Sequence, residues 1–204
     1  MISKSHRFIF IHLPKTAGCS IEKSLFPELS AHNPHPLRKN GFSINYQHGT
    51  LEEKVNFHKD CASFFSFCVV RNPWDRLVSF YLHISQRRRA WKKGLKPPDV
   101  FSFKDMINYL YFKNFPNFFV HCPYRFIRPC AEWVRGITFI CKFENLQYDF
   151  DKICLKLELD SRTLPTVNSS VREGYASYYD DDLINMVGDL YKKDIEHFGY
   201  EFEA

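Results

Sequence analysis

Residues 8–20 have the sequence FIFIHLPKTAGCS, in which small polar residues follow a short apolar run. The apolar run, Phe8–Leu13, predicts a buried strand, and Ser20–Leu25 predicts the helix that follows. Successive backbone N–H groups between a strand and a helix can converge on an anion. Lys15 adds a positive charge to this turn, and Gly18 permits close approach of the backbone. The stretch therefore predicts a strand, an anion-binding turn and a helix.

The turn differs from the nucleotide-triphosphate loop GxxxxGK[ST]. Lys15 precedes Gly18, and no earlier glycine is present in the turn. This order argues against a magnesium-dependent NTPase. The side chains of Thr16, Cys19 and Ser20 add short hydrogen-bond donors near the helix N-terminus. By itself, the string also fits an ordinary strand-to-helix turn.

A second strand and helix follow the same order. Residues 64–70 are apolar at nearly every position, as in a parallel strand that is covered on both faces. Asn72 is a suitable N-cap, and Pro73 suits the first helical position. The apolar residues that follow at helical spacing are Trp74, Leu77, Val78, Tyr81 and Leu82. This face is expected to pack onto the sheet.

Strands and helices alternate through the rest of the chain. Residues 137–141 predict a third strand, and residues 31–49 an irregular connection. Further helices are predicted over residues 101–119, 148–157 and 180–197. The alternation predicts an α/β fold with a central, mostly parallel β-sheet flanked by helices, and ligands beyond the carboxyl ends of its strands. No repeat or Gly/Ser linker marks a boundary, so residues 1–204 are expected to form a single domain.

Composition narrows the possible classes. The 204 residues carry a formal charge of +5, which suits anionic ligands without requiring nucleic acid. The densest basic cluster, Arg87–Lys96, fits a solvated helix end or a site for a polyanion equally well. Seven cysteines without a CxxC pair, and an N-terminal segment without a long apolar run, predict a reduced, cytoplasmic protein. No run is long enough for a membrane span, and no grouped ligand spacing predicts a metal site.

Three blocks occur in a specific order: FIHLPKTAGCS at 10–20, VVRNPWDRLVSFY at 69–81 and FENLQYDFDKI at 143–153. Together they resemble the sulfotransferases that use 3′-phosphoadenosine-5′-phosphosulfate (PAPS), in particular the carbohydrate sulfotransferase branch. The ending, YYDDDLINMVGDLYKKDIEHFGYEF, is also similar to that family, and the likeness is weakest over 84–135. The resemblance implies a P-loop-like three-layer fold. It also implies in-line transfer of a sulfuryl group to a hydroxyl or amine, on a carbohydrate or glycan by the branch, with the bisphosphate PAP as product.

The resemblance also implies roles for individual residues. The first block binds the 5′-phosphosulfate through Lys15, Thr16, Ala17, Gly18, Cys19 and Ser20, with Lys15 as the key cation. The second block binds the 3′-phosphate through Arg71 and Ser79, and a late loop closing over the cofactor offers Arg172 as a further ligand or as a solvated surface residue. Many members carry a hydroxyl residue where this chain has Cys19. A helix N-terminus lowers a thiol pKa, so Cys19 is either prone to oxidation or a passive spacer.

The acceptor must lose a proton, and a histidine is the natural base near neutral pH. His48 is the first candidate, because related carbohydrate sulfotransferases often place a catalytic histidine on the segment before the second strand. Glu22 and Glu52 are the alternative bases, since burial can raise a carboxylate pKa. His12 is assigned to the buried end of the first strand and ranks below them.

Other classes remain open at this point. One is a nucleotide kinase or NTPase on a related scaffold, and another is a non-catalytic module in which the Arg87–Lys96 cluster binds an anionic glycan or nucleic acid. A third is a sulfotransferase-like protein that binds PAPS without turnover. Lys15, Arg71 and Ser79 occurring together favour an active enzyme. The sequence leaves the acceptor and the oligomeric state open.

Overall fold

The computed structural model of the protein describes residues 1–25, 48–86, 102–113, 126–167 and 172–203. The Arg87–Lys96 cluster and most of the predicted connection over 31–49 lie outside these residues. The described chain forms two compact units. The first unit comprises Met1–Arg71 and Cys130–Ser169, and the second comprises Asn72–Pro129 and Ser170–Ala204.

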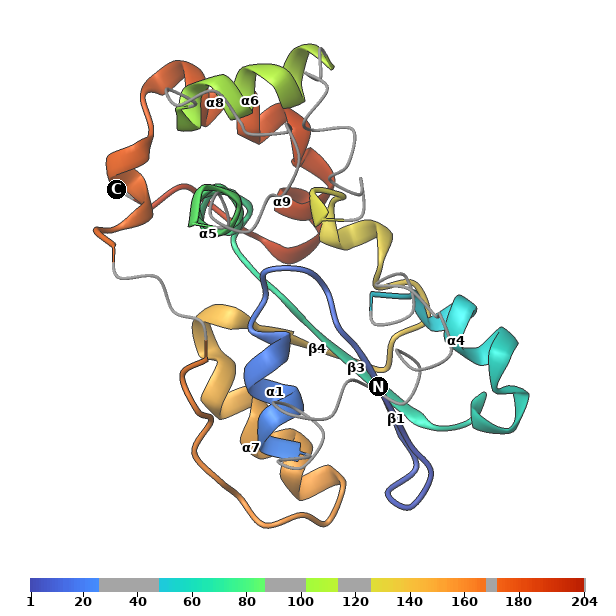
Figure 1. Cartoon of the computed structure of the whole chain (residues 1–204). Helices are drawn as coiled ribbons and strands as arrows, with labels where there is room; N and C mark the ends of the chain where they lie inside the picture. The colour runs from blue at the N-terminus through green and yellow to red at the C-terminus, as the bar shows by residue number, and fades with distance from the viewer. Residues whose placement is uncertain (26–47, 87–101, 114–125, 168–171, 204) are drawn as a thin grey trace. The chain divides into compact units, whose positions relative to one another are not determined.

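The first unit contains a sheet with the order β1-β2-β3-β4 (Figure 1). Its strands are β1 (Ile2–Ser3), β2 (Phe8–Ile11), β3 (Phe65–Val70) and β4 (Phe139–Lys142). The β2–β3 and β3–β4 pairs are parallel, and only the short β1 runs antiparallel to its neighbour. The predicted α/β fold with a mostly parallel sheet is confirmed, and the carboxyl ends of β2 and β3 lie at one edge.

Both faces of the strands are buried. Alternate residues of one face join a hydrophobic core with α1 (Gly18–Leu25) and α7 (Leu146–Lys156), which lie on the same side of the sheet (Figure 1). This core consists of Phe8, Phe10, Ile21, Phe67, Val69, Cys141, Phe150, Ile153 and Cys154. On the other face, Ile9 and Cys68 are also buried. The continuous apolar runs of the sequence therefore match strands covered on both sides.

Shorter elements complete the first unit. Helix α4 (Leu51–Phe57) begins with a capping box, in which Thr50 and Glu53 exchange side-chain to backbone hydrogen bonds. The 3-10 turns are η2 (Lys59–Cys61), η5 (Cys130–Glu132) and η6 (Phe143–Asn145). The last of these directly follows β4 and begins the third sequence block.

The second unit is helical. It contains α5 (Pro73–Gln86), α6 (Phe103–Phe112), η7 (Tyr175–Tyr178), α8 (Asp181–Leu190) and α9 (Lys192–Phe198). Asn72 caps α5 as predicted, because its Oδ1 accepts a hydrogen bond from the Trp74 amide at 3.1 Å. The apolar face of α5 was expected to pack onto the sheet. That packing stays a prediction. Within the second unit, the Trp74 indole donates to the Ile184 carbonyl of α8, and the Tyr81 ring contacts Phe103 of α6.

Two predicted helices differ in extent. The helix predicted over 180–197 is divided at Tyr191, whose φ of −115° and ψ of 23° leave the helical region. The buried Tyr191 side chain donates its hydroxyl proton to the Ile127 carbonyl at 2.5 Å, which fixes the break. The helix predicted over 101–119 begins at a Ser102 cap and ends at Lys113 in the left-handed region. Among the helices of the described residues, none is long and apolar enough to cross a membrane.

Candidate functional site

The loop between β2 and α1 has an alternating backbone. Lys15 and Ala17 have φ values of 67° and 62°, whereas Thr16 between them is outside the left-handed region. Such alternation turns successive N–H groups toward one side, which is the geometry of an anion-binding nest. A left-handed conformation costs a non-glycine residue about 1–2 kcal/mol. The loop is therefore held in a conformation that the local chain does not favour.

Internal hydrogen bonds hold this loop. The Thr16 hydroxyl donates to the Leu13 carbonyl at 3.0 Å, and the Thr16 residue is fully buried. The Ser20 amide donates to the Ala17 carbonyl at 2.9 Å as α1 begins. The Thr16 side chain, expected as a donor to the ligand, is thus engaged within the loop, and its backbone amide is the group that belongs to the nest.

Gly18 is required by a neighbouring ring. A Cβ atom at this position would lie 2.1 Å from Cδ2 and 2.3 Å from Nε2 of His12. Sequence analysis assigned Gly18 to close approach of the backbone to an anion. The structure shows that the His12 imidazole already makes this close approach from inside the protein.

His12 is the central group of a buried polar cluster. Its Nδ1 lies 3.0 Å from Oε1 of Glu22. Burial by itself would lower the pKa of His12, but the hydrogen bonds to Cys19 and Glu22 outweigh it and raise the pKa to about 9. Hydrogen bonding to His12 is also the largest cause of a lowered pKa of Cys19. At neutral pH, His12 therefore carries a positive charge directly beside the loop.

His48 lies next to His12. Its Nδ1 is 2.8 Å from the His12 carbonyl oxygen, and the two rings meet edge to face with centroids 4.8 Å apart. A carbonyl oxygen only accepts hydrogen bonds, so Nδ1 carries the proton and Nε2 is the basic nitrogen. Burial, together with the charge of His12, lowers the pKa of His48 to about 4. His48 is therefore neutral at pH 7.

The alternative bases have different surroundings. The Glu22 carboxylate is bound to His12, as described above, and is therefore part of this cluster. Glu52 is exposed in the first turn of α4. His48 and Glu22 both contact His12, which lies beside the loop. Sequence analysis ranked His12 low.

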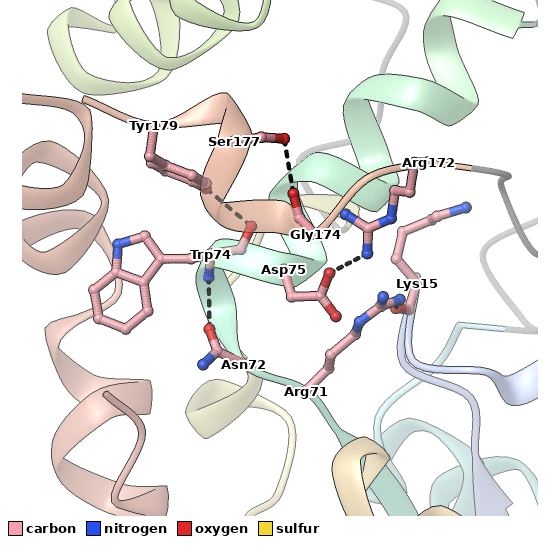
Figure 2. Close-up of polar contacts among 9 residues, drawn as sticks. All are labelled: Lys15, Arg71, Asn72, Trp74, Asp75, Arg172, Gly174, Ser177 and Tyr179. Atoms are coloured by element: carbon pink, nitrogen blue, oxygen red, sulfur yellow. Dashed lines mark hydrogen bonds and ion pairs between the residues drawn. The ribbon is translucent and has the colours of Figure 1, made fainter. Parts of the chain in front are cut away.

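Arg71 connects the three sequence blocks. It follows β3, and its Nη1 donates to the Lys15 carbonyl at 3.1 Å (Figure 2). Its guanidinium carbon lies 3.9 Å from the centroid of the Phe143 ring, a cation–π contact. Arg71, at the end of β3, therefore binds the left-handed Lys15 of the loop. Phe143, from the third sequence block, supports the Arg71 guanidinium and so serves the architecture of the site.

The second unit holds its own polar group. Asp75 of α5 forms an ion pair with Arg172, and both side chains are about 85% buried (Figure 2). The Nη1 atom of Arg172 is buried and has no hydrogen-bond partner among the residues that the structure describes. Nearby, the Tyr179 hydroxyl donates to the Trp74 carbonyl at 2.9 Å (Figure 2). Asp75, an acidic residue in the first turn of α5, is thus the carboxylate that binds Arg172.

The predicted phosphate ligands are distributed over both units. Arg71 belongs to the first unit, whereas Arg172 and the half-buried Ser79 of α5 belong to the second. Their predicted binding of one phosphate stays a prediction. Within the described residues, no group of three or more His, Cys, Asp and Glu side chains could hold a metal ion.

A strand-to-helix anion nest on a mostly parallel α/β sheet is typical of proteins that bind phosphate or sulfate esters. The model of the Sulfotransferase family matches residues 1–201, and the chain belongs to that family. Among solved structures, the chain is similar to the crystal structure of a sulfotransferase from Alicyclobacillus acidocaldarius, with 13% identity and a TM-score of 0.45. The alignment covers 96% of this chain and 87% of that one. No curated protein matches the sequence.

Proposed function

We propose that this sulfotransferase transfers a sulfuryl group from PAPS to an acceptor hydroxyl or amine, with a carbohydrate or glycan as the acceptor class. The observation that carries the proposal is the contact between Arg71 and the Lys15 carbonyl. This contact holds open an alternating loop whose amides and lysine suit an anionic ester. It also joins, in one place, the two sequence blocks that resemble the donor-binding blocks of PAPS-dependent enzymes.

The loop is proposed to bind the 5′-phosphosulfate. Its amides, from Lys15 to Cys19, and the Ser20 hydroxyl face charge on the bridging oxygen and on the transferred group, and the Lys15 ammonium neutralises that charge. The imidazolium of His12 adds a third source of positive potential behind the loop. Groups fixed in place before the reaction stabilise developing charge without reorganisation, which is the largest contribution in many enzymes.

The transfer itself is proposed to proceed in line. The acceptor oxygen attacks sulfur while the bond between sulfur and the phosphate oxygen of the donor breaks, and PAP leaves with the negative charge. The acceptor proton passes to Nε2 of His48, whose Nδ1 is anchored on the His12 carbonyl. An anion bound at the adjacent loop opposes the charge of His12, which raises the pKa of His48 toward the range useful for a base.

The 3′-phosphate is proposed to bind Arg71, Ser79 and Arg172. The guanidinium of Arg71 is a planar group with several N–H donors, the kind of group that suits recognition of a phosphate. The buried Nη1 of Arg172, which has no partner in the described part of the chain, is a further donor. One family match spans both compact units, which supports the proposal that residues 1–204 form one domain. The six described cysteines form no disulfide, in keeping with the proposed cytoplasmic location.

The test is calorimetric titration with PAP, beside ATP and magnesium. We expect PAP alone to bind, Arg71→Ala to lose binding, and Lys15→Ala to lose most turnover while retaining weak binding. Two exposed basic residues of the same unit, Lys23 and Arg135, provide matched alanine controls that should behave as wild type. Binding of ATP would favour a nucleotide kinase, and binding of neither nucleotide would favour a non-catalytic module.

A further inference from the structure

Residues 201–203 are bound to the start of α5 by the side chain of Asn72. The Nδ2 atom of Asn72 donates to the Glu201 carbonyl at 2.9 Å, while its Oδ1 accepts from the Trp74 amide at 3.1 Å. Asn72 is almost fully buried. Buried amide groups require hydrogen-bond partners, so these two bonds favour one arrangement of the chain. One side chain therefore fixes residues 201–203 against the first turn of α5.

The ring of Phe202 lies at the centre of an aromatic cluster in the second unit. Its centroid is 5.8 Å from that of Trp74, 5.5 Å from that of Tyr175 and 5.4 Å from that of Tyr179. All three contacts are edge to face, an arrangement that aromatic rings prefer at such distances. The Glu203 amide also donates to the Tyr175 hydroxyl at 2.8 Å. Phe202 thus joins the first turn of α5 to η7.

This cluster contacts both chain segments that carry the ion pair between Asp75 and Arg172. Trp74 directly precedes Asp75, and Tyr175 follows Arg172 by three residues. The Tyr179 hydroxyl donates to the Trp74 carbonyl at 2.9 Å, which adds a bond between the same two segments (Figure 2). The cluster therefore sets how closely the backbone beside Arg172 approaches the backbone beside Asp75.

Short hydrogen bonds make the chain after Arg172 a compact turn. The Ser177 hydroxyl donates to the Gly174 carbonyl at 2.8 Å (Figure 2), and the Tyr179 amide donates to the Ala176 carbonyl at 3.0 Å. A turn held in this way moves as one piece, so a shift of its aromatic side chains also displaces Arg172. A guanidinium recognises a phosphate through N–H groups in a fixed planar geometry, and such a displacement lowers its affinity.

We propose that Phe202 is a positioning residue, whose ring holds residues 172–179 against the start of α5 and so keeps Arg172 in place to bind the 3′-phosphate of the donor. The phosphate-binding role of Arg172 rests on the proposed function. Asp75 completes the arrangement, because its carboxylate binds one side of the guanidinium. The buried Nη1 atom, which has no partner among the described residues, is the donor left for the phosphate.

A double-mutant cycle separates positioning from general support of the fold. The full chain, Phe202→Ala, Arg172→Ala and the double variant are titrated with PAP by calorimetry. We expect Phe202→Ala to lower PAP affinity about tenfold, the loss expected when one charge-assisted hydrogen bond is misplaced. In the Arg172→Ala background, the same change should lower it less than about twofold. Phe202→Tyr keeps the ring and should bind PAP as wild type does, as should Phe112→Ala, which removes an exposed ring of the same unit.

Amide hydrogen exchange of the unliganded chain tests the contact without any nucleotide. Residues 173–179 should exchange faster in Phe202→Ala than in wild type, because the turn loses its contact with residues 201–203. Tyr175→Phe keeps its ring but loses the hydroxyl that accepts from the Glu203 amide, and it should increase exchange by less. This milder variant supplies the test if Phe202→Ala does not fold.

Two results would overturn the proposal. One is unchanged exchange of residues 173–179 in the folded variants. The other is an equal loss of PAP affinity with and without Arg172, which would make Phe202 a general support of the fold. If wild type binds no PAP while exchange increases as expected, the sulfotransfer proposal fails and the positioning of Arg172 by Phe202 stands.

Discussion

Adding one methyl group at Gly18 should disrupt the loop through His12. An alanine Cβ at this position would lie 2.1 to 2.6 Å from three atoms of the imidazole ring. The ring is held on one edge by Glu22 and is almost fully buried, so it has no flexible end that could move aside. Either the ring or the first turn of α1 must shift.

The expected cost follows from overpacking. Inserting a methyl group into a close-packed site destabilises a protein by about 1–3 kcal/mol, and overlap with three ring atoms favours the upper end. For a chain of this size, each kcal/mol lowers the melting temperature by about 2–4 °C, so Gly18→Ala should melt about 6–12 °C below wild type at the upper end. PAP affinity should fall as well, because Cys19 and Ser20 move with the displaced turn.

Thermal unfolding followed by circular dichroism measures this change, with Gly174→Ala as the control. No atom of the described residues lies within 4 Å of a Cβ at Gly174, and that variant should melt as wild type does. The double variant with His12→Ala removes the ring and should recover stability relative to the sum of the two single changes, a coupling of about 1–3 kcal/mol. Simple additivity of the two changes would refute the assigned contact.

Three further predictions follow from buried charge and packing. Burial depresses the pKa of His48 to about 4, so the neutral side chain contributes fully to the free energy of unfolding above pH 6.5, and this contribution is lost as the pH falls toward 4. Denaturant unfolding at a series of pH values should show that the free energy of unfolding falls by about 3 kcal/mol over this range, and His48→Gln should lack this fall. Phe143→Leu removes the ring beneath Arg71, and PAP titration should show affinity lowered by about 0.5–2 kcal/mol. Asp194→Ala leaves the buried Arg76, whose Nη1 is 3.6 Å from the Asp194 carboxylate, without that charge partner and should cost about 3–5 kcal/mol in denaturant unfolding. Replacing both members of this pair by apolar residues should cost less, and an equal cost would contradict the pairing.

Much of the architecture was predictable because it depends on local pattern. Continuous apolar runs identify β2 and β3 as strands buried on both faces, and the cap at Asn72 sets the start of α5 within one residue. The partner of an apolar helical face is not encoded in its periodicity. The face of α5 is therefore identifiable from the sequence, whereas its contacts with α6 and α8 depend on the tertiary structure.

The sequence predicted the main cations of the site but not the residues that surround and hold the loop. Lys15 and Arg71 were identified from their blocks, and the structure brings them into contact. His12 was ranked low because a histidine at a strand end usually has a structural role. One signal was present: Cys19 and Glu22 are three residues apart on a helix, which places both side chains on one face where a third group can join them. The identity of that third group depends on the fold.

The bond from Arg71 to Lys15 has a consequence for the order of folding. It joins residues 56 positions apart, and the ring that supports the arginine lies farther along the chain still, after β4. Local propensity opposes the left-handed Lys15, so the nest should be the last part of the first unit to become ordered, after three strands have paired across long stretches of chain. A donor nucleotide that binds only the ordered loop would then stabilise the fully folded state relative to partly folded states. After dilution from denaturant, the rate at which nucleotide binding recovers would report the rate at which the sheet is completed. The nucleotide would also stabilise the folded chain against unfolding, and the stabilisation would increase with nucleotide concentration.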